Sequence, residues 1–245
     1  MIKFFRKIRQ NLLMENKTGK YFKYAIGEII LVVIGILIAL QINNWNENRK
    51  VKEAELTLYT RIVNDLKVDK EKLEIIVDKL KIFRKTQIQV YRESIGEATY
   101  DENIEYIQLR WGERFNPVVK ENNNLAISTI SSDSIRNRIN QYFKQEAKTI
   151  EALELSNKLR RGKLRDFLTK NGVLNTSALY DIKDFGFDSL NHLDFINYDK
   201  LKEQYGSIEL DQILAELRIE MSWTLTKVLE LIEENENLIL TLESK

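Results

Sequence analysis

The side chains that most often perform catalysis or bind metals are scarce in this chain of 245 residues. His192 is the only histidine and cysteine is absent, so one chain cannot form a multi-histidine or His–Cys zinc site. No serine lies in a G-x-S-x-G turn, and any Ser–His triad would depend on His192 as its base. Its surroundings, DSLNHLDF, favour a surface or capping role. We therefore predict no catalytic residues of these classes, no bound metal and no cofactor.

Acidic side chains are the remaining candidates for chemistry. The glycine patterns that bind phosphates are absent, and DFG at Asp184–Gly186 occurs without the other kinase elements. Two carboxylates from distant parts of the chain could still act as an acid–base pair. Five aspartates also lie close together in the sequence, but their spacing is not that of an EF-hand loop, so we expect at most weak cation binding there. This group consists of Asp181, Asp184, Asp188, Asp194 and Asp199.

A basic cluster, KLRRGKLR, occupies residues 158–165. One hypothesis is that it contacts lipid phosphates or an acidic partner. The alternative is an ordinary solvated helix face. The residues proposed for such a contact are Arg160, Arg161, Lys163 and Arg165.

One apolar stretch is a candidate membrane-spanning helix, and it determines where the groups named above lie relative to the membrane. Ala25–Ile42 holds 18 residues, and twelve of them are Ile, Leu or Val. At about 1.5 Å per residue such a helix spans roughly 27 Å, close to the thickness of a bilayer's hydrocarbon core. Tyr21, Tyr24 and Trp45 flank it at headgroup level. Because no small-x-small cleavage site follows, we predict an uncleaved transmembrane signal anchor over residues 25–44.

The distribution of charge predicts the orientation of this anchor. Residues 1–24 carry seven bases against Glu15, whereas three bases, Arg49, Lys50 and Lys52, closely follow the apolar stretch. This asymmetry predicts a cytoplasmic, basic, amphipathic stub at 1–24 and a domain at 45–245 on the other side of a bacterial inner membrane, in the periplasm. Nucleic acid is not an expected partner, because the basic excess lies on the short stub.

Glu28 interrupts the apolar stretch. On a helix it shares a face with Gly35 and Ala39, a small-xxx-small pair that lets a second helix approach closely. One interpretation is a contact with a partner helix, or with a second copy of this chain, in which Glu28 is hydrogen-bonded. The other is that Glu28 reaches back to the headgroups. Both remain open.

The rest of the sequence favours an all-α fold. Pro occurs once and Gly nine times, and apolar side chains recur at alternating spacings of three and four residues. We predict long helices from the membrane to about residue 93, from Ser131 or Ser132 to about Lys170, and over Ile208–Leu242. A bundle of about three long antiparallel helices would bury their apolar stripes. The clearest stripe is Leu210, Leu214, Leu217, Met221, Thr224, Val228, Leu231, Asn235, Leu238 and Leu242.

Part of the sequence resembles a known family. YAIGE at Tyr24–Glu28, followed by VVIGILIALQINNWNENRK at Val32–Lys50, resembles the opening of uncharacterised single-pass membrane proteins frequent in Bacteroidota, catalogued as a domain of unknown function. ISTISSDSIRNRINQYF at Ile127–Phe143 resembles the start of that family's central helix, although ENNNLAIST stands where a serine–glycine turn is more usual. The resemblance implies a membrane location and a helical domain, and no activity.

Two functions follow as expectations. The first is a membrane-anchored helical-bundle protein that acts by binding, as a scaffold, adaptor or sensor input in the bacterial cell envelope. The second is a membrane-tethered enzyme that uses carboxylates alone. A deep cleft lined by paired acids would favour the enzyme, whereas a tightly filled bundle would favour binding.

Overall fold

A computed structural model describes residues 18–177 and 195–245 of the chain. It is all-helical, with 81% of the structure in helices and no strand among the described residues, which confirms the all-α class. An isolated antiparallel bridge joins Leu174 and Ile196. The chain divides into two compact units, Met1–Thr57 and Leu58–Lys245, and each is described separately.

The helix α2, Thr18–Ser94, extends through both units. Neither Gly nor Pro occurs between Ile36 and Ile95, so nothing in this stretch interrupts the backbone hydrogen bonds. The helix stops where Gly96 adopts a φ of 77°, a left-handed conformation that glycine tolerates best. Beyond this turn, the Glu97 amide donates to the Arg92 carbonyl at 2.8 Å.

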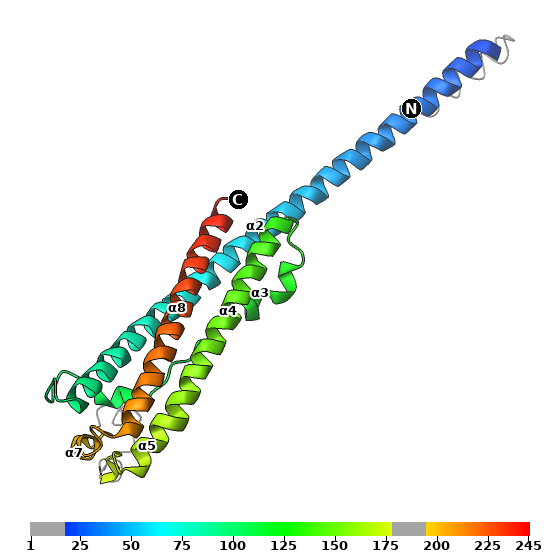
Figure 1. Cartoon of the computed structure of the whole chain (residues 1–245). Helices are drawn as coiled ribbons and strands as arrows, with labels where there is room; N and C mark the ends of the chain where they lie inside the picture. The colour runs from blue at the N-terminus through cyan, green and yellow to red at the C-terminus, as the bar shows by residue number, and fades with distance from the viewer. Residues whose placement is uncertain (1–17, 178–194) are drawn as a thin grey trace. The chain divides into compact units, whose positions relative to one another are not determined.

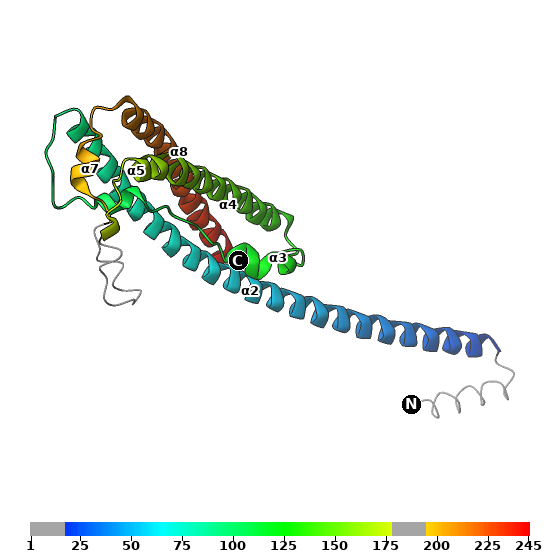
Figure 2. The same cartoon turned by 90° about the horizontal axis from the view of Figure 1, so that it is seen from below.

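Three long helices pack within Leu58–Lys245. They are the second part of α2, α4 (Asp133–Leu159) and α8 (Ile208–Glu243), and they lie side by side in Figures 1 and 2. Every residue of the predicted apolar stripe on the last helix is buried, Thr224 and Asn235 included. On α2, Lys70 lies at the edge of the core and forms an ion pair with Glu236 of α8 at 2.7 Å. The stripes predicted from the sequence therefore form one continuous core.

The connector between α2 and α4 runs back along α2. It contains the 3-10 helix η1 (Tyr106–Leu109) and the helix α3 (Val119–Ile127). Each of its successive contacts reaches an earlier residue of α2. These contacts join Tyr106 to Glu93, Glu113 to Lys79, Asn116 to Lys72, Val118 to Asp69 and Asn123 to Arg61.

The direction of α4 differs from our expectation. Because the connector returns the chain to the Leu58 end, α4 runs parallel to α2, and Arg160 lies beside Phe83. Only α8 is antiparallel to both, since Gln87 of α2 bonds to Leu214 and Gln145 of α4 bonds to Glu230. The prediction of alternating antiparallel helices is therefore wrong for α2 and α4.

Helix ends follow local rules. Ser132 caps α4 by accepting the Ile135 amide, one of the two predicted caps, and Ser207 caps α8 through the Leu210 amide. A π-helical turn, η2 (Arg160–Leu164), joins α4 to α5 (Arg165–Lys170). Gly172, with φ of 65°, ends this segment as predicted. The short helix α7 (Tyr198–Lys202) precedes α8.

Candidate functional site

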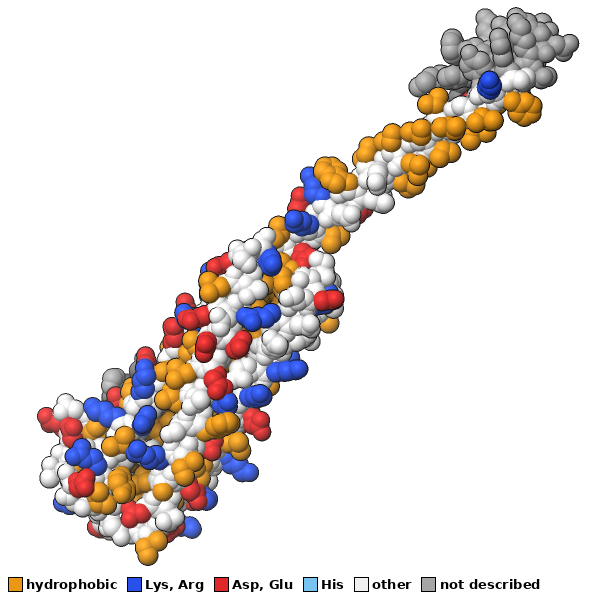
Figure 3. Space-filling view, turned by 45° about the horizontal axis from the view of Figure 1, so that its top comes forward, with side chains coloured by type: hydrophobic (Ala, Val, Ile, Leu, Met, Phe, Trp, Pro, Cys, Tyr) orange, Lys and Arg blue, Asp and Glu red, His pale blue; other side chains and the backbone are white. Residues whose placement is uncertain are grey.

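The apolar stretch at 25–42 is exposed in the described structure. Its Ile, Leu and Val side chains each keep 46–63% of their surface accessible. Among the described residues, α2 is the one helix long and apolar enough to cross a membrane. Figure 3 shows its hydrophobic side chains as a continuous orange band, unlike the mixed charges on Leu58–Lys245. Such a surface is stable in lipid and costly in water.

The predicted helix–helix contact residues lie within this stretch. Gly35 and Ala39 are exposed, and a Cβ added at Gly35 would meet nothing within 4 Å. Glu28 is partly exposed and takes part in an interaction. Among the described residues of Met1–Thr57, α2 has no second helix beside it, so a contact through Glu28, Gly35 and Ala39 stays a prediction.

The structure divides the predicted basic cluster. Arg160 is 3% exposed, and its guanidinium lies 3.6 Å from the ring centroid of Phe83. It donates to the Trp111 carbonyl at 2.5 Å and contacts the Met221 sulfur at 2.8 Å. Burial lowers its pKa to about 10, which still leaves the group charged at neutral pH. Arg160 is therefore a core residue, and its proposed contact with lipid or an acidic partner is wrong for this fold.

The other three basic residues have different roles. Lys163 forms an ion pair with Glu216 of α8 at 2.6 Å, and Arg165 donates to the Arg110 carbonyl at 3.2 Å. Arg161 is exposed and lines a groove. The π-helical turn accounts for this division, because its extra residue rotates the side chains that follow relative to those of α4.

That groove lies between the connector and α4 and has a volume of about 610 Å³. Its apolar lining comes from Phe115, Pro117, Ile150 and Leu153. Three exposed cations also line it and form no ion pair with any described residue: Arg114, Lys158 and Arg161.

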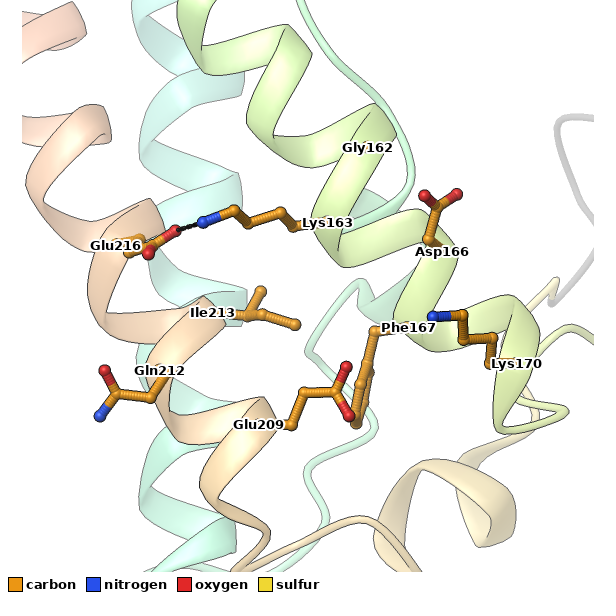
Figure 4. A pocket seen from close by; sticks show the side chains of 9 residues that line it. All are labelled: Gly162, Lys163, Asp166, Phe167, Lys170, Glu209, Gln212, Ile213 and Glu216. Atoms are coloured by element: carbon orange, nitrogen blue, oxygen red, sulfur yellow. Dashed lines mark hydrogen bonds and ion pairs between the residues drawn. The ribbon is translucent and has the colours of Figure 1, made fainter.

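A second groove, of about 480 Å³, separates α8 from the η2–α5 segment (Figure 4). Phe167 and Ile213 are its buried apolar residues. The Lys163–Glu216 ion pair crosses one end, while the carboxylates of Asp166 and Glu209 point in different directions. The acids of this groove therefore do not form the close pair that acid–base catalysis needs.

A buried carboxylate that the sequence did not reveal lies at the end of α2. Glu93 is 7% exposed and accepts hydrogen bonds from three tyrosine hydroxyls: Tyr106 at 2.5 Å, Tyr205 at 2.6 Å and Tyr198 at 2.9 Å. The Gln89 amide donates to it at 2.7 Å. Four donors match the acceptor capacity of an ionised carboxylate. We call these five residues the Glu93 cluster.

The Glu93 cluster connects three distant parts of the chain, since its tyrosines come from η1, α7 and the turn before α8. Burial, followed by the bond to Glu93, raises the pKa of Tyr198 to about 12 and raises the pKa values of Tyr106 and Tyr205 further. All three hydroxyls therefore stay protonated and act as donors near neutral pH. The arrangement is a structural clamp, because every acceptor position of Glu93 is filled. No periodic pattern in the sequence joins these positions.

The described residues contain no group of three or more His, Asp or Glu side chains arranged to hold a metal ion. Asp199 lies in the first turn of α7. His192 and the other predicted acids lie outside the described residues: Asp181, Asp184, Asp188 and Asp194.

Comparison of the chain with curated proteins and with solved structures found no match. A family model does match, and it covers α2 from Glu28, the whole connector and the first residues of α4. The matched region includes Asp69, Glu93 and the connector contacts, whereas α8 lies beyond it. The resemblance noted in the first 50 residues is thereby confirmed: residues 28–136 match the family of unknown function DUF6090.

Proposed function

We propose that this chain is a membrane-anchored protein whose helical domain acts by binding. The observation that carries the proposal is the exposed stretch at 25–42, where none of 18 successive residues is buried in the described structure. Twelve aliphatic side chains contribute roughly −4 to −7 kcal/mol to membrane insertion, against about +3 kcal/mol for an acid at the helix centre, and Glu28, in the first turn of the stretch, should cost less. Lipid is therefore the expected surrounding of this segment.

The orientation follows from charge. Seven bases before the apolar stretch favour a cytoplasmic N-terminus in a bacterial inner membrane, which would place residues 45–245 in the periplasm. The anchoring test is fractionation of cells that express the full chain, with alkaline extraction of the membranes. We expect the protein to stay in the membrane pellet. Replacing Ile34 and Leu37 with Asp should release it, and retention of that variant would contradict the anchor.

Orientation needs a separate measurement. A reporter that is active only in the periplasm, fused after Lys245, should be active, and a reporter that fluoresces only in the cytoplasm should be dark. The opposite result would reverse the topology and leave the anchor itself intact.

Binding is favoured over catalysis by the interior of the domain. The apolar stripes of α2, α4 and α8 fill a common core, and both grooves are open at the surface. Two acids line the groove between the connector and α4: Glu113, which pairs with Lys79, and Glu154. The groove between the connector and α4 combines an apolar lining with three cations, a surface suited to an acidic partner. Arg161 is the residue of the predicted basic cluster that this proposal retains.

A photo-crosslinking residue at position 161, incorporated in the membrane-embedded protein, tests this surface. We expect a discrete adduct that is lost when Arg114 and Lys158 are changed to Glu. The matched control is position 125, because Leu125 is 88% exposed and does not line this groove. Equal adducts at both positions would argue against a specific binding surface.

The anchor could also associate with another anchor. Glu28, Gly35 and Ala39 share a helix face, and small side chains there would allow close approach. In a membrane two-hybrid assay, Gly35→Leu should weaken self-association, whereas Gly27→Leu, on another part of the helix surface, should have less effect. Unchanged association in both variants would remove this proposal.

A further inference from the structure

A polar layer crosses the middle of the core, where α2, α4 and α8 meet. Asn235 of α8 donates to the Leu66 carbonyl of α2 at 3.0 Å and to the Tyr142 hydroxyl of α4 at 3.2 Å. One helical turn after Tyr142, Glu146 lies on the same face of α4 and is 3% exposed. Its Oε2 atom is buried and has no hydrogen-bond partner among the described residues, and neither has Oδ1 of Asn235.

The neighbouring acid, Asp69, does not supply the hydrogen bond that Glu146 lacks. Asp69 of α2 is fully buried and accepts the backbone amides of Val118 at 2.9 Å and Val119 at 3.2 Å. Through these bonds it caps α3, a role that an ionised carboxylate performs best. Lys72, at 3.4 Å, is the ion-pair partner of Asp69. Burial raises the pKa of Asp69, whereas the two backbone amides and Lys72 lower it, and an ionised Asp69 opposes a second negative charge at Glu146.

The charged groups around Glu146 are few. Asp69 faces it from α2, Lys120 from α3, and the Tyr142 hydroxyl lies beside it on α4, while α8 contributes the uncharged amide of Asn235. Lys120 is exposed, and its ammonium lies 5.8 Å from the ring centroid of Phe143. Among the described residues, no ion pair joins Lys120 to Glu146. Burial, with a smaller effect of Asp69, raises the pKa of Glu146 to about 7, although Lys120 opposes the shift.

We propose that Glu146 is a proton-binding site in the core, and that the three-helix bundle is most stable when this carboxyl is protonated. A neutral carboxyl removes the repulsion from Asp69 and the cost of burying an uncompensated charge. An ionised carboxyl retains both the repulsion and the burial cost, so the folded bundle is then less stable. The packed domain would therefore respond to the acidity of its surroundings, whatever partner it binds.

The direction of the pH effect follows from linkage. Glu146 has an ordinary value of 4.5 in the unfolded chain and a pKa of about 7 in the fold, so the folded state binds the proton more strongly. The stabilisation is complete below pH 4.5 and is lost as the pH rises through 7. Within this window the ratio of folded to unfolded protein should fall by up to about tenfold per pH unit through this one group.

The test uses the full chain in detergent micelles and follows denaturant unfolding from pH 4.5 to pH 8.5. Glu146→Gln cannot ionise and nearly preserves the shape, so its unfolding midpoint should lack the decline between pH 4.5 and 7 and should exceed that of the unaltered protein at pH 8. Glu154→Gln is the matched control, because Glu154 is an exposed acid on the same helix. This control should follow the unaltered protein.

Infrared spectroscopy supplies a direct second measurement. The unaltered protein should show the carbonyl band of a buried protonated carboxyl at pH 5 that disappears near pH 7, and Glu146→Gln should lack it. If the glutamine variant does not fold, Glu146→Met should give the same loss of the band. Parallel pH dependence in Glu146→Gln and the unaltered protein, or a band that is unchanged by the substitution, would overturn the proposal.

Discussion

Glu93 and Glu146 are both buried in the same bundle, yet their surroundings are opposite. Glu93 is 7% exposed and receives four hydrogen bonds, whereas Glu146 is 3% exposed and has a carboxylate oxygen that receives none from the described residues. Burial alone therefore does not determine what a carboxylate does. Where donors surround a buried carboxylate, its hydrogen bonds join distant segments of the chain; where donors are absent, burial favours the protonated carboxyl.

The largest loss of stability is expected when Glu93, the carboxylate with four hydrogen bonds, is removed. Glu93→Ala leaves one buried and two partly buried tyrosine hydroxyls without their acceptor, so we expect the free energy of unfolding to fall by about 3–5 kcal/mol. Denaturant unfolding of the full chain in micelles measures it. Glu102→Ala, at an exposed acid in the connector, should change stability by less than about 0.5 kcal/mol. A similar loss in both variants would show that Glu93 is not a clamp.

The second prediction distinguishes Glu93 from Glu146 by the alkaline titration of the tyrosines in the Glu93 cluster. The pKa of Tyr198 is about 12, and those of Tyr106 and Tyr205 are also raised, so their contribution to stability is complete below pH 10 and is lost as the pH rises through 12. Absorbance of tyrosinate should therefore appear late in the unaltered protein and earlier in Glu93→Ala. Glu146→Gln should leave this titration unchanged, because Glu146 contacts none of these tyrosines.

The contribution of each tyrosine hydroxyl in the Glu93 cluster to stability should follow the length of its hydrogen bond to Glu93. Tyr205→Phe removes the 2.6 Å bond and should cost about 1–3 kcal/mol, and Tyr198→Phe, which removes the 2.9 Å bond, should cost less. Thermal unfolding of the two variants checks the order. The reverse order would mean that packing of the rings, including the 4.5 Å contact between Tyr100 and Tyr198, outweighs the hydrogen bonds.

The smallest effect concerns the neighbour of Glu146. Asp69→Asn removes the negative charge that opposes ionisation, so the pKa of Glu146 should fall, by less than burial raises it. The pH at which the infrared band of the protonated carboxyl disappears would report this shift. The variant also weakens the cap of α3, so its stability should fall at every pH. An unchanged titration would show that burial alone sets the pKa of Glu146.

Periodicity predicted the long helices well. The stripe on α8 is buried at all ten predicted positions, because a repeat of three and four residues aligns one face of a helix over its whole length. The caps at Ser132 and Gly172 were also predictable, since they depend on chemistry within a few residues.

The path of the connector and the buried polar groups were not predictable in this way. The direction of α4 depends on contacts between residues far apart, such as Asp69 with the amide of Val118, which leave no periodic trace. The burial of Arg160 follows from that direction, because it is the parallel arrangement that brings its guanidinium onto Phe83. The Glu93 cluster likewise draws on side chains more than 100 residues apart.

The antiparallel α8 has a consequence for biosynthesis. It is the last helix of the bundle to be made, and Asn235 closes a contact with Leu66 across 169 residues. Until the ribosome has produced α8, the apolar faces of α2 and α4 have no third helix to cover them. A chain that emerges slowly would thus expose these faces from the completion of α4 at Leu159 until α8 is made, and a chaperone that shields them would act before translation ends.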